Sequence, residues 1–409
     1  MKNNKKWSVR AVALTAVLLI SASSASASSI YSRFGIGLVQ HFSLSRTIGM
    51  GGVGIATLSS SALPYMNSAA LPYITGTRFD GSLRYENANI NFPNNEGSLA
   101  NASFNSFQVV FPVKKGYGLG IGLQPYSVVS FRISQEVEFP GSTSTATESL
   151  TGIGGLQRGF VHFGGTLGKH FSYGAGMNVF FGGVEKTWRV IPTDDSFSPT
   201  RDITNSHIRG LGWNTGLVFR ANNHISLGAV FQFPTSLGTR TRVEYATGRI
   251  TPEVTSDTKL PFSHGYGFYL VPTTKWRFGG EVYLQNWSDV ESQEIFESTT
   301  VNTRRISAGF GYTPSNKPFS GFFERMTYSA GLILAKLPYT ETGASVNEIQ
   351  ERLLTLGMAV PFNANRGKLD FGIAIGKRGS LDKNSAEETI FQFTAAVTGG
   401  EIWFIRRRR

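Results

Sequence analysis

The sequence contains no cysteine and few charged residues. Asp, Glu, Lys and Arg make up 16% of its 409 residues, against roughly 25% in ordinary soluble domains. Without cysteine the chain can form no disulfide framework, no thiolate-ligated zinc site and no Fe–S site. No apolar run reaches the roughly twenty residues that a membrane-spanning helix requires. The sequence therefore disfavours both a soluble globule and a helical membrane protein.

Positive charge is concentrated at the two ends of the chain. The formal net charge is +12 at pH 7. Lys2, Lys5, Lys6 and Arg10 lie at the start, and residues 406–409 are a basic tail of four arginines. A nucleic-acid-binding protein needs its basic face within the folded domain. We therefore predict no nucleic-acid partner, and we expect the tail to contact an anionic membrane surface.

Residues 1–27 have the three parts of a secretory signal peptide. A basic stretch precedes an apolar core at Ala11–Ile20, and the small-residue sequence Ala25-Ser26-Ala27 follows. This order is typical of a cleaved export signal, and the apolar core is too short to span a bilayer. The chain is therefore predicted to leave the cytoplasm.

From about residue 76 onward, apolar residues alternate with glycine or polar residues. The pattern is clear in 171–181 (FSYGAGMNVFF), 224–233 (HISLGAVFQF) and 368–377 (KLDFGIAIGK). A period of two indicates β-strands with one apolar face. Glycine, present 47 times, fills much of the second face, whereas a soluble sandwich would place many charged residues there. The pattern is that of a transmembrane β-barrel, with one face toward lipid and the other toward the lumen.

Such runs predict an all-β fold, an antiparallel barrel of about fourteen strands over residues 76–405. We expect a turn at Asn222–His224, another at Asn363–Gly367 and an extracellular loop at Pro192–Ser206. Residues Val346–Leu354 could form a short helix, but a strand is preferred. The predicted strands are 76–92, 100–113, 117–138, 143–168, 171–190, 206–221, 224–245, 249–272, 275–298, 301–313, 324–337, 347–361, 367–378 and 386–404.

Residues 28–75 do not follow the strand pattern. The segment is rich in Gly, Ser and Ala and has few charges, yet it is too apolar for a disordered tail. We predict that it forms a plug, or hatch, inside the lumen. Gly49, Gly51 and Gly52 belong to a GxGxxG match, but no strand–helix–strand unit surrounds it, as a dinucleotide site would require. Close backbone packing within the plug is the preferred interpretation.

The stretches SSIYSRFGIGLVQ and SRTIGMGGVGIA follow the predicted signal peptide. In these stretches the chain resembles the FadL/TodX/OmpP1 family of outer-membrane transporters for hydrophobic compounds, in the versions found in Bacteroidota and relatives. The family has an Asn-Pro-Ala plug motif, and Asn67, Ser68 and Ala69 stand in its place, with serine instead of proline. LPFSHGYGFYLVPTTKWRFGGEVYLQNWSDV also resembles a family stretch. The resemblance implies a fourteen-stranded barrel, an N-terminal hatch and sideways release of ligand through a gap in the wall.

The resemblance implies passive transport of long-chain fatty acids or other hydrophobic molecules across the outer membrane of a Gram-negative bacterium. We hypothesise that Tyr31, Phe34 and Leu38 lie near the ligand pocket, although they could instead only pack the plug against the wall. The expected partners are the ligand, outer-membrane lipids and the barrel assembly machinery, and a monomer is expected. A type IX secretion barrel that binds protein cargo is the alternative, and an open porin is a third possibility.

An enzyme is not expected, because the sequence has no GxSxG elbow. The six histidines show neither HExxH nor paired spacing, so we predict no metal site. No catalytic residue and no cofactor are predicted.

Overall fold

The computed structural model describes residues 28–41, 45–138, 144–194, 198–290, 300–315, 317, 319–342, 346–362 and 367–401. The predicted signal peptide and basic tail lie outside these ranges. Within them, no helix is long and apolar enough to cross a membrane.

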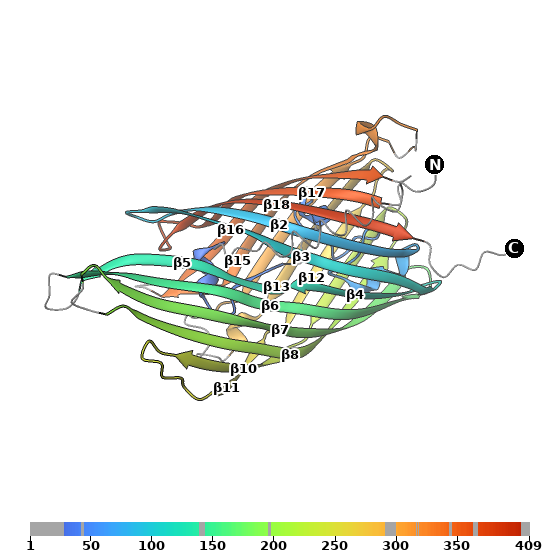
Figure 1. Ribbon diagram of the computed structural model, residues 1–409. Helices are drawn as coiled ribbons and strands as arrows, with labels where there is room; N and C mark the ends of the chain where they lie inside the picture. The colour runs from blue at the N-terminus through green and yellow to red at the C-terminus, as the bar shows by residue number, and fades with distance from the viewer. Residues whose placement is uncertain are drawn as a thin grey trace, which may run out of the picture.

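The described strands form one closed antiparallel barrel (Figure 1). Closure follows from the pairing of the last strand, β18, with the first barrel strand, β2, over residues 387–401 and 77–91. Three strand positions are each interrupted once, namely β4 with β5, β9 with β10 and β11 with β12, which gives the predicted fourteen. The barrel strands are β2 (Thr77–Asn91), β3 (Glu96–Lys114), β4 (Tyr117–Pro125), β5 (Ser127–Glu138), β6 (Thr145–Leu167), β7 (Phe171–Pro192), β8 (Thr200–Arg220), β9 (Ile225–Gln232), β10 (Thr235–Glu244), β11 (Val254–Leu260), β12 (Ser263–Leu270), β13 (Trp276–Gln285), β14 (Thr303–Tyr312), β15 (Thr327–Thr342), β16 (Val346–Phe362), β17 (Gly367–Gly379) and β18 (Glu387–Glu401).

The alternation predicted from the sequence separates the two faces of the wall. On β7, Phe171 and Phe181 are 55% and 45% exposed, whereas Ser172 and Asn178 are buried at 2% and 0%. Aromatic and aliphatic side chains are exposed in the same way on the other strands. An outward apolar band around a closed sheet is the surface of an outer-membrane β-barrel, so the predicted location is confirmed.

The two ends of the barrel differ in the length of their connections. At one end, most connections are short turns, such as 115–116, 168–170 and 221–224, which contains the predicted turn Asn222–His224, and residues 313–326 form one longer connection. At the other end, β10 and β11 are joined by residues 245–253. Short turns mark the periplasmic end of such barrels, and longer loops mark the extracellular end.

Several predicted boundaries are wrong. Strand 275–298 ends at Gln285, because Trp287 turns inward in a 3-10 helix, η3 (Trp287–Asp289), and is fully buried. The predicted loop Pro192–Ser206 is shorter, because β8 already begins at Thr200; its polar first residues pair with β7 although they lack apolar alternation. The preferred strand at Val346–Leu354 is confirmed by β16. The predicted turn Asn363–Gly367 lies largely outside the described residues.

Three strands predicted as continuous are interrupted. The breaks fall after Pro125, at residues 233–234 and at residues 261–262, and each contains or follows a proline. Proline has no N–H to donate to a ladder, so it is placed where pairing is broken. The break after Pro125 is the one at which β5 separates from β3.

Residues 28–41 and 45–75 lie within the barrel, where Figure 1 shows them in blue among the strands. They contain 3-10 helix η1 (Ile30–Arg33), strand β1 (Leu38–Val39), helix α2 (Ser45–Ile48) and 3-10 helix η2 (Ser68–Tyr73). We call residues 28–75 the N-terminal segment. It packs on the inner wall so closely that a Cβ added at Gly118 would lie 2.7 Å from the carbonyl oxygen of Leu71.

Candidate functional site: a break in the barrel wall

The barrel wall is interrupted between β3 and β5. The ladder between β3 and β4 covers Phe107–Lys114, and β5 then pairs with β6 from Val129 to Glu138. Among the described residues no ladder joins 96–105 of β3 to β5. Figure 1 shows β5 running apart from the β2–β3 hairpin toward the extracellular end. The hydrogen-bonded wall is therefore interrupted between these strands, and we call this break the lateral opening.

A β-bulge produces this opening. Pro125 pairs with Gln157 and Val129 pairs with Gly154, so three residues of one strand face only two of β6. Gly154 and Gly155 have φ values of +122° and +129°, which only glycine adopts without strain. A bulge bends its strand and exchanges the side chains that face inward and outward. Phe131 thus points into the lumen, and β5 turns away from β3.

The N-terminal segment is hydrogen bonded to the edge of β5 that is not paired with β3. Strand β1 pairs with Val128 and Ser127. The backbone N–H groups of Ser28 and Ser29 donate to the carbonyl oxygen of Ser130 at 2.7 and 3.2 Å. The N–H of Ser130 donates to Ser32 Oγ at 3.0 Å. The segment therefore covers this edge from the inside, much as a short strand would.

The other side of the segment is tied to β17 and β18 through a buried charge network. Glu388, which is 0% exposed, accepts hydrogen bonds from Ser29 Oγ at 2.7 Å and from the N–H of Ile30 at 2.8 Å. Arg378 contacts Glu388 at 2.8 Å and Glu351 at 2.6 Å. Buried charges are costly unless they are paired. This network, which we call the latch, fixes one end of the segment.

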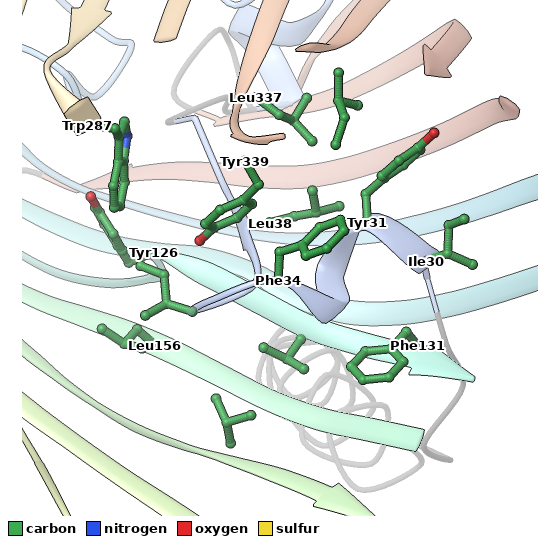
Figure 2. Packing of buried hydrophobic residues seen from close by; sticks show 14 of the residues in the cluster. Ile30, Tyr31, Phe34, Leu38, Tyr126, Phe131, Leu156, Trp287, Leu337 and Tyr339 are labelled. Atoms are coloured by element: carbon green, nitrogen blue, oxygen red, sulfur yellow. The ribbon is translucent and has the colours of Figure 1, made fainter. Parts of the chain in front are cut away.

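Between the latch and β5, the predicted residues Tyr31, Phe34 and Leu38 lie in one buried apolar cluster. Figure 2 shows them with Trp287 and Tyr339 from the opposite wall. The Phe34 and Tyr339 rings are 6.1 Å apart between centroids. The three residues predicted to be near the pocket are therefore together, at the level of the lateral opening.

Only Leu38 of these three lines a cavity among those described. The cavity has a volume of about 60 Å³. Apolar Leu38, Ile48 and Leu353 line it together with Arg378 and Glu351 of the latch and with Arg84 and Arg305. A cavity that holds benzene is about 150 Å³. The space beside Leu38 is therefore too small for such a ligand in this conformation, and a hydrophobic ligand can enter it only if the segment moves.

His41 lines the same cavity but adds no charge to it. Burial, and to a lesser extent the nearby Arg305 guanidinium, lower its pKa to about 3. The imidazole is therefore neutral at physiological pH. The charge of the cavity comes from its arginine, lysine and glutamate side chains.

The predicted glycine motif passes over glycines of the wall. Gly49 lies against Gly357, and Gly51 donates its N–H to Thr355 Oγ1 at 3.0 Å. A Cβ at Gly309 or Gly331 would overlap the backbone of Met50 and Gly51. Gly52 is buried beside them, with φ at +84°. The motif thus allows backbone-to-backbone contact.

The Asn67 motif anchors the segment lower in the barrel. Asn67 Oδ1 accepts from the N–H of Ala69 at 3.0 Å, and its Nδ2 donates to Ile55 and Leu217 carbonyl oxygens at 2.8 and 3.1 Å. Ser68 and Ala69 are both buried. The asparagine therefore caps 3-10 helix η2 and joins it to the wall, with serine in the family proline position.

The sequence did not point to the latch or to Glu281. Glu281 accepts hydrogen bonds from the N–H groups of Gly54 and Ile55 at 2.8 and 3.0 Å. The available signal was an inward-facing charge on a strand with period-two alternation. That signal gives the face of a residue but not its partner.

Substituting a glycine of the wall should loosen the segment without breaking the barrel. In Gly331→Ala the new Cβ would overlap Gly51, so hydrogen exchange of residues 47–57 should accelerate by about tenfold or more as the segment opens locally. Gly97→Ala is the matched control, because nothing lies within 4 Å of its Cβ. Hydrogen-exchange mass spectrometry measures both. Equal protection in the two variants would show that this close approach is not needed.

The fold and the opening define a class, an outer-membrane β-barrel with an inner segment across a break in its wall. Within that class, residues 4–409 match the model of the BamG family, and the chain belongs to that family. No curated protein matches the sequence.

Solved structures share the fold at low sequence identity. The CymD monoaromatic hydrocarbon channel is 14% identical, with a TM-score of 0.57 over 90% of this chain and 98% of that one. The P. putida toluene transporter TodX is 13% identical, with 0.57 over 88% and 99%. A Pseudomonas aeruginosa FadL homologue is 12% identical, with 0.59 over 89% and 99%. The predicted FadL-like fold is therefore confirmed.

Proposed function

We propose that this protein passes hydrophobic compounds from the lumen sideways into the outer membrane through the break between β3 and β5. The proposal rests on one observation, that the break coincides with the apolar cluster around Phe34. A hydrophobic ligand that leaves at this level enters the bilayer without crossing the polar surface layer. The similar fold of a toluene transporter and of a monoaromatic hydrocarbon channel supports this choice.

We further propose that the N-terminal segment is a plug, whose residues 28–40 close the opening. Its contacts with β5 are a two-residue strand pairing and a few serine hydrogen bonds. Each such bond contributes only about 0.5–1.5 kcal/mol net. They hold a closed state and still permit opening when a ligand competes for the apolar cluster. Tyr31, Phe34 and Leu38 would then contact the ligand.

The ligand that fits best is amphipathic, such as a long-chain fatty acid. The cavity beside Leu38 combines apolar walls with Arg84, Arg305 and Arg378. Apolar walls with a few convergent polar groups are typical of ligand sites, and an arginine suits a carboxylate head group. We also assign the chain to a Bacteroidota-like branch, on its opening sequence, and propose insertion by the barrel assembly machinery.

Deleting residues 28–40 should uncouple uptake from closure. Uptake of labelled oleate by cells should fall, because the apolar cluster loses Ile30, Tyr31, Phe34, Ile36 and Leu38. Conductance of the purified protein in planar bilayers should rise, because no segment covers the opening. Heat-modifiable migration on gels, which reports a folded barrel, should persist. Unchanged oleate uptake would show that the segment takes no part in transport. A stable complex with secreted proteins would then favour the alternative function, a type IX secretion barrel that binds protein cargo.

A further inference from the structure

The outer face of the barrel continues beyond its apolar band on the extracellular side. On β7 the last large outward aromatic is Phe181, and Arg189 follows eight residues later on the same face. The ladders of β7 with β6 and with β8 run without a register shift over this stretch, so the alternation of faces is preserved. Arg189 therefore points outward, away from the lumen and its proposed ligand path.

Two further arginines share this face. Arg201 of β8 lies directly opposite Arg189, and Arg132 of β5 is paired with Thr151 of β6, which faces Thr187 of β7. Directly opposed side chains on neighbouring strands have Cβ atoms about 4.5–5.5 Å apart, and like charges there are destabilising. In the described parts of the chain, no carboxylate is within ion-pair distance of these three guanidinium groups. An anionic ligand would remove this repulsion.

The three arginines line a cleft of about 580 Å³. Hydroxyl groups of Ser134, Thr147, Ser149 and Thr151 line it too, and Glu185 is the one carboxylate among its described lining residues. Ligand sites commonly measure 300–1,000 Å³. Guanidinium groups bind phosphate and carboxylate groups in a bidentate manner, and hydroxyls donate to and accept from sugar hydroxyls. The lining thus suits an anionic saccharide.

The height of the cleft identifies where such a saccharide would lie. Eight residues at about 3.3 Å each, on a strand tilted by about 40°, place Arg189 roughly 20 Å above Phe181 and the edge of the apolar band. Arg209, which faces outward directly opposite Phe181, lies at that edge. From the membrane outward, the barrel surface has an apolar band, then Arg209, then the cleft around Arg189. An outer-leaflet glycolipid has its acyl chains, phosphates and head-group sugars in the same order.

We propose that this cleft binds the phosphate- or carboxylate-bearing core sugars of lipopolysaccharide in the outer leaflet. Arg189 and Arg201 together bind one acidic group, and Arg132 binds a second one. The serine and threonine hydroxyls form hydrogen bonds with the sugar rings. The glycolipid holds the extracellular ends of strands β5 to β8 in place beside the lateral opening. The cleft also reaches Ser130 and Phe131 at the edge of β5, so it adjoins the lateral opening.

The test compares binding of rough lipopolysaccharide, which carries core sugars, with binding of lipid A, which lacks them. Purified full-length protein in detergent is titrated with each, and affinity is measured by thermophoresis. We expect R189Q/R201Q to weaken binding of rough lipopolysaccharide by about tenfold or more, to leave lipid A binding unchanged, and to remain heat-modifiable on gels. Added salt should weaken wild-type binding, as for any exposed charge pair.

The matched control is R304Q/R352Q, which removes two exposed outward arginines from β14 and β16. It should bind rough lipopolysaccharide as wild type does. Equal weakening in both variants would show diffuse attraction instead of a site and would overturn the proposal. So would unchanged binding in R189Q/R201Q. If R189Q/R201Q still bound the glycolipid but no longer bound an acidic protein that the wild type binds, the cleft would be a protein contact and the proposal would be overturned.

Discussion

Joining the N-terminal segment to β5 with a disulfide should stop hydrophobic uptake, and reduction should restore it. Val39 and Ser127 are register partners in the ladder between β1 and β5, a spacing that a disulfide can bridge. The chain has no cysteine of its own, so V39C/S127C forms no competing bond. With the segment fixed, the apolar cluster cannot open to a ligand. Oleate uptake under oxidising conditions should fall to the level of cells without the protein.

The two single variants, V39C and S127C, are the controls. Each should transport oleate equally well in oxidising and reducing conditions, which separates locking from the loss of the Ser127 side chain. The hydroxyl of Ser127 donates to Ile36 at 2.6 Å, so its replacement alone can lower uptake but cannot make uptake redox-dependent. Normal uptake in the oxidised, fully cross-linked double variant would mean that the segment need not leave β5.

Replacing Arg378 with Met should release the start of the N-terminal segment. Arg378 is 4% exposed at its side chain, and its guanidinium lies 2.6 Å from Glu351, 2.8 Å from Glu388 and 3.8 Å from Glu86. Removing this cation leaves buried Glu388 and its neighbour Glu351 without the guanidinium that pairs with them, at a cost of about 3–5 kcal/mol. The protein can relieve that cost by letting water in, which displaces Ser29 from Glu388. The segment should then become susceptible to trypsin.

Arg33 provides the cleavage site, and mass spectrometry of the products measures it. In the wild type, Arg33 is paired with Glu341 at 3.0 Å and lies next to the buried cluster, so cleavage should be slow. The neighbouring substitution Lys377→Met is the control, because the Lys377 side chain is 61% exposed and its pair with Glu387 contributes about 0–1 kcal/mol at most. Equal resistance to trypsin in the two variants would show that the latch does not hold the segment.

The barrel itself could be predicted because its signal is local. Lipid on one side and the lumen on the other impose a period of two on each strand, as on Phe171–Phe181, and the strands can then be counted along the chain. The enclosed position of residues 28–75 followed from their lack of alternation together with their apolar character. These features need no knowledge of which residue meets which.

The opening and the latch depend on pairings that alternation does not encode. Residues on both sides of Tyr126 look like one strand, and only the three-to-two mismatch opposite Gly155 bends it. Ser29 and Glu388 are 359 positions apart in the chain. A single sequence shows that Glu388 lies on a strand, but not that its partners are Arg378 and the start of the N-terminal segment. Pro125 is the one local feature of the sequence that indicates an interruption here. It predicts that strand pairing is broken at this residue, but it does not predict the lateral opening between β3 and β5.

The route of the ligand can be measured directly by photocross-linking. Cells take up a fatty acid that carries a diazirine near its alkyl end, are irradiated during uptake, and adducts are mapped by mass spectrometry. Leu99 of β3 and Ile133 of β5 both pack against the apolar cluster at the break. We predict adducts on these facing strands and on Phe34. Adducts confined to the periplasmic-end cavity around residues 57–62 would contradict sideways release through the wall.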